Sequence, residues 1–380
     1  MTIDFNAPIQ RWGSDSTKWD RYKSTEIIPM WVADMDFRSP EPVIDALHRR
    51  IEHGVFGYTG ISKELNRVVV DRLERKYGWS VDPVWLVWLP GIVSGLNIAC
   101  RAVGNDGDDV MTTTPVYPPF LSAPKLSRRN LVSVPLLPEN AGWTVDWDRL
   151  DKRWTSRSRI MLLCNPHNPV GRVYRREELV QLVDFCARHD MVVCSDEIHC
   201  DLILEPDLDH IPTASLSQEA ADRTITLMAP SKTFNIPGLG CGFAIIPNRN
   251  LRARFKTAMD GIVPHVNALG LTAALAAYTS GWHWLTELLG YLRGNRDLVQ
   301  RHIDALPGLR TWPVEATYFA WIDTRDTGLK NPFKHFESFG VGLSDGKDSG
   351  SDGFLRLNFG CPRTLLKVGL ERMQAAVQRL

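Results

Sequence analysis

The sequence has 380 residues, 44% of them hydrophobic and 23% charged, which suits a globular enzyme with a large core and room for two domains. Lysine plus arginine and aspartate plus glutamate both number 44, so the charge gives no sign of a nucleic-acid or membrane-surface partner. The seven cysteines are scattered with no Cys-x-x-Cys pair, which argues against a disulfide framework or a zinc site. We find no signal-peptide pattern and no apolar run of membrane-spanning length, and expect a cytoplasmic protein.

The first part of the chain combines an irregular arm with two helices. Residues 1–30 are polar and indicate an arm that lies on the protein. Residues 29–37 have no helical period; they either form a loop that presents backbone and an acidic side chain, or end a buried strand. The spacing of apolar residues predicts helices over 42–53 and 65–77. The glycine-rich segment between these helices carries Tyr58.

The middle of the chain alternates between short apolar strands and helices. One helix is predicted to follow the first strand, at 85–89, and to end at Val103, and another is predicted over 176–189. This alternation predicts one mostly parallel sheet that helices cover on both faces. The strands are predicted at 85–89, 110–113, 131–136, 159–164, 191–194, 224–228 and 243–246.

The C-terminal part has a different character and indicates a smaller α+β unit. We place a large domain at residues 46–284 and a small domain at residues 1–45 plus 285–380. This division rests on the elements predicted for the C-terminal part. These are helices over 269–278 and 282–306, strands over 317–323 and 353–359, and a closing helix from Thr364.

The stretch Ala229-Pro-Ser-Lys-Thr-Phe-Asn235 places a lysine directly after a buried strand. Pro230 ends the strand, so Ser231 and Lys232 are expected on a turn. Burial lowers the pKa of an amine and frees its lone pair, which a Schiff-base lysine requires. The stretch alone leaves two interpretations open, a catalytic lysine and a lysine that merely caps a strand.

Four predicted strand ends carry polar side chains, namely Tyr117, Asn168, Asp196 and Lys232. In an open parallel sheet, ligands bind beyond the carboxyl ends of the strands. The turn at residues 91–94 opens a helix and offers backbone N–H groups to a phosphate. No dinucleotide fingerprint or NTPase phosphate loop is present. Together these features predict a site for a planar, phosphorylated cofactor with a carbonyl group, with an acid at one end.

The residues at these positions resemble a known family. The chain is similar to fold-type I pyridoxal-phosphate enzymes of the class I/II aminotransferase superfamily, and within it to the MalY/PatB group of cystathionine β-lyase-like C–S lyases. The resemblance implies an α/β fold with a mostly parallel seven-stranded sheet in the large domain, beside a smaller α+β domain. The matching stretches begin at Met30, Gly57, Thr114, Asn165, Ser195, Ala229 and Leu355 and span almost the whole chain.

The resemblance implies a role for each residue around the ring of pyridoxal 5'-phosphate. Lys232 would bind the cofactor as a Schiff base and then move the substrate's Cα proton. Asp196 would keep the pyridine nitrogen protonated. Asn168 would contact the phenolic oxygen and Tyr117 the ring face. His199 stands where many relatives have a tyrosine, and a core histidine remains an alternative.

For the phosphate group, the resemblance implies the backbone of Ile92 and Val93 and the hydroxyl of Ser231. Tyr58 would reach the cofactor of a neighbouring subunit, so that a homodimer shares its active sites; with Lys232 and Asp196 it completes the expected catalytic set. Many aminotransferases have a phosphate-binding arginine where this chain has Gly240. The C–S lyase group commonly lacks that arginine too.

For the substrate, the resemblance implies that Arg356 binds the α-carboxylate and that Ala33 and Asp34 lie beside it. The expected reaction is α,β-elimination on an S-substituted L-cysteine, cystathionine or a larger conjugate, which gives a thiol, pyruvate and ammonia. The same residues would suit an aminotransferase or a natural-product enzyme that couples decarboxylation to oxidative deamination. A regulatory binding protein is a further alternative; the intact Lys232, Asp196 and Arg356 argue against loss of catalysis but leave room for such a second role.

Overall fold

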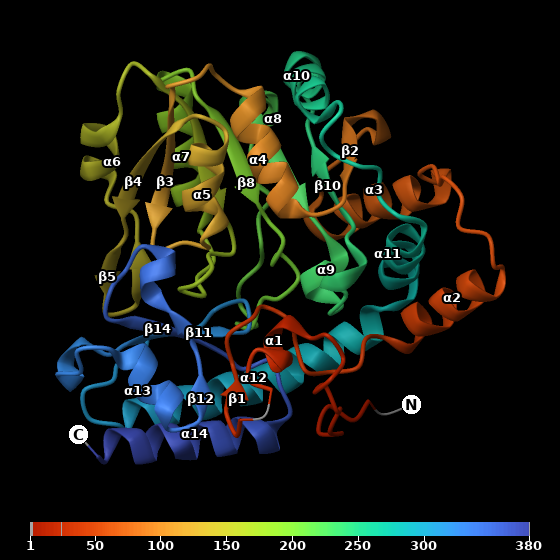
Figure 1. Ribbon diagram of the computed structural model, residues 1–380. Helices are drawn as coiled ribbons and strands as arrows, with labels where there is room; N and C mark the ends of the chain where they lie inside the picture. The colour runs from red at the N-terminus through yellow and green to blue at the C-terminus, as the bar shows by residue number, and fades with distance from the viewer. Residues whose placement is uncertain (1–2, 24, 380) are drawn as a thin grey trace.

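In the computed structural model, which describes residues 3–23 and 25–379, one seven-stranded sheet organises the larger part of the molecule (Figure 1). All neighbouring strands run parallel except β10, which is antiparallel to both β2 and β9. This confirms the predicted mostly parallel sheet. In spatial order the strands are β2 (Leu86–Leu89), β10 (Gly242–Ile245), β9 (Thr224–Met228), β8 (Val192–Asp196), β7 (Ser158–Cys164), β3 (Asp109–Thr114) and β4 (Asn130–Pro135).

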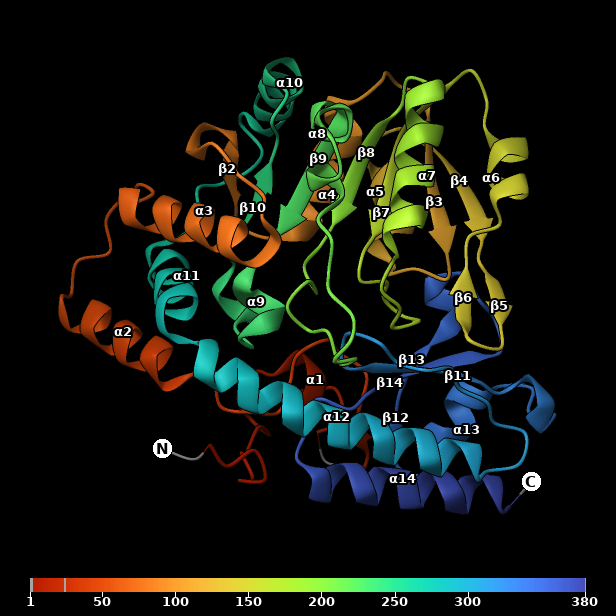
Figure 2. The same cartoon turned by 180° about the vertical axis from the view of Figure 1, so that it is seen from behind.

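Helices cover both faces of this sheet, which explains why its central strands are buried along their whole length. On the face toward the viewer in Figure 1 lie α4 (Ile92–Ala102) and α5 (Pro119–Leu126), with α10 (Arg249–Met259) packed against α4. On the other face lie α7 (Arg176–Arg188) and α8 (Gln218–Arg223), as Figure 2 shows. At the β4 edge lie α6 (Trp147–Arg153) and the hairpin of β5 (Leu137–Glu139) and β6 (Gly142–Thr144).

Helix α4 lies unusually close to the sheet because it has a glycine at the contact. A Cβ atom on Gly95 would meet side-chain atoms of Leu227 and Leu89 at 3.0 Å. The close packing fixes the position of the helix, and its first turn lies at the carboxyl edge of the central strands. This edge is where ligands bind in open α/β sheets.

At the β2 edge, α2 (Glu41–Glu52) and α3 (Lys63–Tyr77) pack with α11 (Ala268–Ser280). Ser62 caps α3 by accepting a hydrogen bond from the backbone N–H of Leu65 at 3.0 Å. Gly78 ends the helix in the left-handed region, at φ 59°. The loop that joins α2 to α3 projects from the molecule (Figure 1).

The C-terminal part forms a small sheet of β11 (Phe319–Asp323), β14 (Phe354–Asn358) and β13 (Ser344–Asp345), in that order. Three helices pack around it: α12 (Trp282–Asp304), α13 (Pro332–Ser338) and α14 (Arg363–Val377). The N-terminal segment joins this part, because β1 (Ile28–Pro29) pairs in parallel with β12 (Val341–Gly342). The arm also contains the one-turn helix α1 (Thr17–Asp20). The domain limits at residues 45 and 284 remain a prediction.

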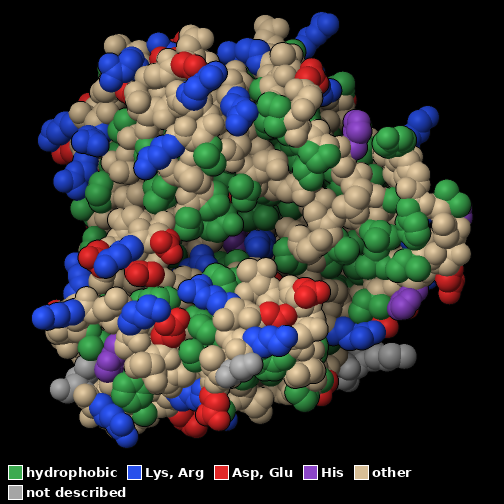
Figure 3. Space-filling view, in the orientation of Figure 1, with side chains coloured by type: hydrophobic (Ala, Val, Ile, Leu, Met, Phe, Trp, Pro, Cys, Tyr) green, Lys and Arg blue, Asp and Glu red, His purple; other side chains and the backbone are tan. Residues whose placement is uncertain are grey.

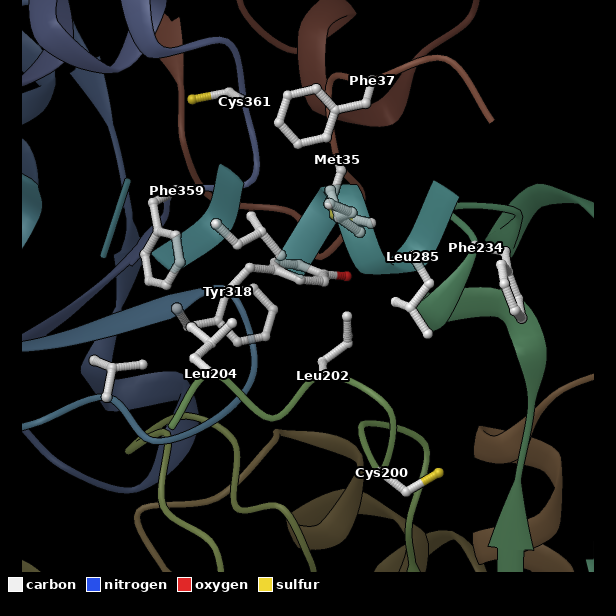
Figure 4. Packing of buried hydrophobic residues seen from close by; sticks show 14 of the residues in the cluster. Met35, Phe37, Cys200, Leu202, Leu204, Phe234, Leu285, Tyr318, Phe359 and Cys361 are labelled. Atoms are coloured by element: carbon white, nitrogen blue, oxygen red, sulfur yellow. The ribbon is translucent and has the colours of Figure 1, made fainter. Parts of the chain in front are cut away.

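A buried apolar cluster joins the two parts of the molecule. Figure 4 shows Tyr318 and Phe359 from the C-terminal part, Leu285 from α12 and Leu202 from the loop after β8 packed around one space. Met35 enters this cluster from the N-terminal segment. No helix within the described residues is both long and apolar enough to cross a membrane. All seven cysteines are free and buried.

Candidate active site

Lys232 lies at the carboxyl edge of the large sheet, and the turn predicted for it is the single helical turn α9 (Pro230–Thr233). Its Nζ donates a hydrogen bond to the carbonyl oxygen of Ala33 at 2.7 Å. Burial and the charge of Arg356 lower the pKa of Lys232 to about 8, although the carboxylates of Asp34 and Asp196 act in the opposite direction. A lysine with this pKa is neutral in a useful fraction of molecules near neutral pH.

Asp196 ends β8 and has lost almost all contact with solvent. Its Oδ1 accepts a hydrogen bond from the backbone N–H of Ile198 at 3.1 Å. Burial raises the pKa of Asp196 to about 7, and the neighbouring Glu197 adds to this shift. Within the described residues, no lysine, arginine or histidine forms an ion pair with Asp196. The carboxylate is therefore suited to a cationic group that enters from outside the chain.

Lys232 and Asp196 line an inner cavity of about 210 Å³ at the first turn of α4. The first N–H groups of α4 lack partners within the helix, and Gly91 precedes them as the N-cap residue. The cavity collects nearly all of the residues that the resemblance implied for the cofactor. These are Lys232, Asp196, Asn168, Tyr117, His199, Ser231, Ile92 and Val93, and Ala33 lines the same space.

His199 and Tyr117 complete the wall of the inner cavity. His199 is buried, and its Nδ1 has no hydrogen-bond partner. Burial and the positive charges of Lys232 and Arg356 hold the pKa of His199 well below its usual value, so the imidazole is neutral. Tyr117 is half-buried, and burial raises the pKa of its hydroxyl, which therefore stays protonated.

Arg356 lies on β14 at the boundary between the inner cavity and a larger outer one. Its guanidinium donates to Asn168 Oδ1 at 3.0 Å and to the carbonyl oxygen of Trp31 at 2.9 Å, and it stacks 4.4 Å from the centre of the Phe319 ring. Nε is buried without a partner. Burial lowers the pKa of Arg356 to about 10. The guanidinium is a buried cation whose hydrogen-bond partners are neutral.

The outer cavity measures about 620 Å³ and brings Arg356, Lys232, Tyr117, Ala33 and Asp34 together. Figure 3 shows the corresponding hollow between the part that contains the large sheet and the C-terminal part, with basic side chains inside it. Its remaining wall comes mainly from the N-terminal arm and from the segment around β13. These wall residues include Arg11, Arg21, Trp31, Phe333, Ser344, Asp345 and Asp348.

Residues 30–37 form a loop rather than a strand end, and two asparagines hold it in place. Asn358 Nδ2 donates to the carbonyl oxygens of Val32 and Asp34 at 2.5 and 2.9 Å. Asn235 accepts from the backbone N–H of Met35 at 2.9 Å, and its Nδ2 donates to the Met35 carbonyl oxygen at the same distance. Both asparagines belong to stretches that carried the resemblance, but no sequence pattern indicated that they position this loop.

The N-terminal arm fixes the acidic side chains of the same loop, which the sequence did not reveal. Arg11 forms ion pairs with Asp34 and Asp36, each at 2.5 Å. Lys18, which is buried, pairs with Asp36 at 2.7 Å. Asp34 lines the outer cavity. Its Oδ2 pairs with Arg11, while its Oδ1 is buried and has no hydrogen-bond partner among the described residues.

Tyr58 does not reach the site in the single chain. Its side chain is fully exposed in the loop between α2 and α3, and it lines neither the inner nor the outer cavity. The implied role of Tyr58 in a neighbouring subunit therefore stays a prediction. Gly240, at the position of the missing arginine, has φ 57°, and a Cβ atom there would meet the Pro90 carbonyl oxygen at 3.1 Å. A larger residue at position 240 would therefore be strained.

The residues around the inner cavity fit pyridoxal 5'-phosphate. Lys232 supplies an amine for a Schiff base, and Asp196 supplies a buried carboxylate without a cationic partner. The N-terminus of α4 suits an anion, and Ser231 lies on the same cavity wall. The unpartnered Nδ1 of His199 is a further polar atom that a ligand would satisfy.

The fold and this lysine–aspartate site define a class of enzyme, and comparison with known families agrees with it. The family described as aminotransferase class I and II matches residues 25–373. The chain therefore belongs to this family of fold-type I enzymes, which confirms the family and the fold predicted from the sequence.

Individual relatives are similar to the chain over nearly its whole length, and one of them carries the name of the predicted group. Cystathionine beta-lyase PatB of Bacillus subtilis is 37% identical, over 99% of this chain and all of the relative. The crystal structure of OvoB superposes with a TM-score of 0.97 at 49% identity, with 99% of each chain covered. The crystal structure of cystalysin from Treponema denticola, which contains a pyridoxal 5'-phosphate cofactor, gives a TM-score of 0.94 at 32% identity over the full length of both chains.

Proposed function

We propose that this protein is a pyridoxal-phosphate-dependent carbon–sulfur β-lyase that acts on an S-substituted L-cysteine. The observation that carries the proposal is the arrangement of Lys232, Asp196 and Arg356 around two adjoining cavities. The similarity to a cystathionine beta-lyase over the full length of the chain supports the carbon–sulfur bond as the target. The outer cavity leaves room for a substituent on sulfur.

Six groups of the chain would hold the cofactor. Lys232 would bind its aldehyde carbon and Asp196 its ring nitrogen. Asn168 Oδ1 accepts a hydrogen bond from Arg356 on β14, so Nδ2 of Asn168 remains available to donate to the phenolic oxygen of the cofactor. The N-terminus of α4 and the hydroxyl of Ser231 would hold the phosphate. Tyr117 would lie against the ring.

When bound, the cofactor supplies a cationic ring that takes up the electron pair released at the substrate's Cα. Asp196 keeps that ring protonated, because a buried carboxylate is stabilised by a positive partner. Arg356 binds the α-carboxylate through two parallel N–H groups and so fixes the direction of the Cα–H bond. Lys232, with its lowered pKa, accepts the Cα proton and passes it on to the departing thiolate.

The overall reaction balances with one molecule of water. The bond between Cβ and sulfur breaks, and the thiolate takes up a proton to leave as a thiol. The three-carbon remainder is hydrolysed to pyruvate and ammonia. No 2-oxo acid is consumed, which separates this reaction from transamination.

We further propose that the enzyme works as a homodimer in which Tyr58 completes the partner's site. Val55, Phe56 and Tyr58 have relative solvent exposures of 62%, 59% and 108% on one projecting loop, which is unusual for large apolar groups that lie together. A second copy of the chain would cover them. The phosphate site lacks the arginine that many aminotransferases have at the position of Gly240, so an additional hydroxyl from a partner would strengthen it.

An aminotransferase is the second candidate, and the matching family itself favours it. The lysine, the aspartate and the arginine would serve both reactions. The two reactions differ in the step after the Cα proton is lost: either a group departs from Cβ, or Lys232 would deliver the proton to the bound cofactor.

The visible absorption spectrum tests the cofactor and its attachment. Purified protein supplied with pyridoxal 5'-phosphate should show a band above 400 nm that borohydride abolishes, because a Schiff base to Lys232 is reducible. The Lys232→Ala variant should lack this band. A wild-type protein that binds no chromophore would overturn the proposal.

A further inference from the structure

A second buried charged cluster lies directly behind the lysine turn, and the reaction described above does not use it. Arg72 and Lys76 of α3 both pair with Oδ1 of Asp201. Oδ2 of the same carboxylate accepts a hydrogen bond from the Thr233 hydroxyl at 3.1 Å. Thr233 is the residue next to Lys232, so the cluster ends at the catalytic turn.

The protein encloses this cluster except at Lys76, whose side chain is 38% exposed. Asp201 and Arg72 are 3% and 4% exposed, and Thr233 is completely buried. The Arg72 guanidinium lies 5.4 to 5.5 Å from the ring centres of Tyr77, Tyr278 and Trp282. Burial opposes the ionisation of Asp201, but Arg72 and Lys76 together outweigh it and hold the pKa of Asp201 below its usual range. The carboxylate is therefore charged and fixed.

A buried ion cluster is poor evidence for added stability, because removing charges from water costs about as much free energy as their attraction returns. Such a cluster more readily explains a fixed geometry. The turn that it touches has little support of its own: α9 is four residues long, and its closing backbone bond runs from Phe234 N–H to the Pro230 carbonyl oxygen at 2.9 Å.

The turn is instead held from two sides. Asn235 ties its far end to the loop at residues 30–37, which forms the substrate side of the site. Thr233 ties its inner side, through Asp201, to helix α3. Lys232 directly precedes Thr233 on this turn.

We infer that Asp201 and Thr233 are positioning residues for Lys232, which set the direction of its amine relative to the substrate's Cα. This inference rests on the proposed function, because it needs Lys232 to be the reacting lysine. Small changes in the direction of a proton-transfer group have large effects on rate, and a displacement of about 1 Å can cost on the order of 100-fold.

The test removes the hydroxyl and keeps the shape of the side chain. Thr233→Val should move the pH midpoint of the lysine–cofactor absorption band by about 0.5 unit or more and lower kcat by about 10- to 100-fold, with KM changed by less than about twofold. In the cofactor-free protein, amide hydrogen exchange over residues 229–235 should rise at least about fivefold. Thr233→Ser, which restores the hydroxyl, should return all of these values toward wild type.

The matched control is Thr112→Val. Thr112 is also fully buried, and its hydroxyl donates to the Leu162 carbonyl oxygen at 3.0 Å, within the large sheet. This variant should lower the melting temperature and leave the band midpoint and kcat unchanged. If Thr233→Val does not fold, Thr233→Ala replaces it with the same expected results.

Three outcomes would overturn the inference. One is a Thr233→Val protein with the wild-type midpoint and kcat. Another is a Thr112→Val protein with the same changes as Thr233→Val, which would indicate a general loss of stability. A wild-type protein without any band would instead remove the proposed function, and the inference with it.

Discussion

Arg356 is the residue whose surroundings most clearly indicate a missing negative charge. It is buried against Asn168, Trp31 and Phe319, and within the described residues no carboxylate pairs with it. Arg356→Lys should lower kcat/KM by about 10- to 150-fold, because a hydrogen bond between charged groups contributes about 1.5–3 kcal/mol and an ammonium does not reproduce the planar fork. Steady-state kinetics on a cysteine S-conjugate measures this loss.

Arg129→Lys provides the matched control for Arg356. Arg129 is equally buried but pairs with Asp106 at 2.9 Å, on a loop beside the opposite edge of the sheet. Its replacement should change stability and leave kcat/KM within about twofold. Equal losses in the two variants would show that Arg356 supports the fold and does not bind the carboxylate.

Lys232 should make the stability of the cofactor-free protein depend on pH. The folded protein releases the Lys232 proton near pH 8 and the unfolded chain near 10.5, so the unfolded state binds more protons between these values and stability rises with pH. Lys232→Met should therefore be more stable than the parent at neutral pH by about 1–3 kcal/mol, with a gap that narrows as the pH approaches about 10. Urea unfolding at several pH values measures the gap; a gap that does not vary with pH would show that the pKa is not lowered.

At this scale the sequence predicted which side chains meet, but not how they are held. Lys232, Asp196, Asn168, Tyr117 and Arg356 follow strand ends or lie in recognisable stretches. Their supports, among them Tyr318, Asn358, Arg11 and Asp201, depend on contacts between segments that are far apart in the chain. No local pattern reports such contacts.

Helix α4 provides a test at the scale of an element. Proline is tolerated at the first position of a helix, and Gly91 before it is already extended, so Ile92→Pro should keep the helix and remove one N–H donor. The affinity of Ile92→Pro for pyridoxal 5'-phosphate should be about 10- to 100-fold lower than that of Ile92→Ala, because the proline variant loses one hydrogen bond to a charged group. Fluorescence titration of the cofactor-free variants measures both affinities.

Pyridoxal, which lacks the phosphate, is the matched ligand for this test. Ile92→Pro and Ile92→Ala both lose the buried isoleucine side chain, so pyridoxal should bind the two variants equally. A proline variant that loses affinity for both ligands would place the effect in the shape of the helix and not in the phosphate contact.

The elements that sequence patterns predicted well are those with strong and continuous burial. β9, and β3 after Asp109 at its start, consist of apolar or β-branched residues, and both strands came within one residue of the predicted limits. The hairpin of β5 and β6 was missed because each strand has only three residues, β5 is exposed, and the strands include Pro138 and Gly142. The turn at α9 was predicted, but its helical form was not, because four residues carry no helical period.

At the scale of the whole molecule, the central question about the site is whether two chains share it. A mixed dimer contains one Tyr58→Ala subunit and one Lys232→Ala subunit. One of its two sites would then combine Lys232 of the first subunit with Tyr58 of the second. If Tyr58 acts across the interface, co-expressed variants should recover about a quarter of wild-type activity, although each variant alone is impaired. No recovery in a mixture that sedimentation shows to be dimeric would place Tyr58 outside the partner's site.

Product analysis of the cofactor-loaded enzyme without any 2-oxo acid distinguishes the proposed lyase from an aminotransferase in a single assay. Cystathionine and a panel of other cysteine S-conjugates should each be examined for pyruvate and free thiol. We expect at least one conjugate to give pyruvate and thiol in equal amounts, and Lys232→Ala to give neither. Turnover that appears only when a 2-oxo acid is added, with no thiol released, would contradict the proposed function and identify an aminotransferase.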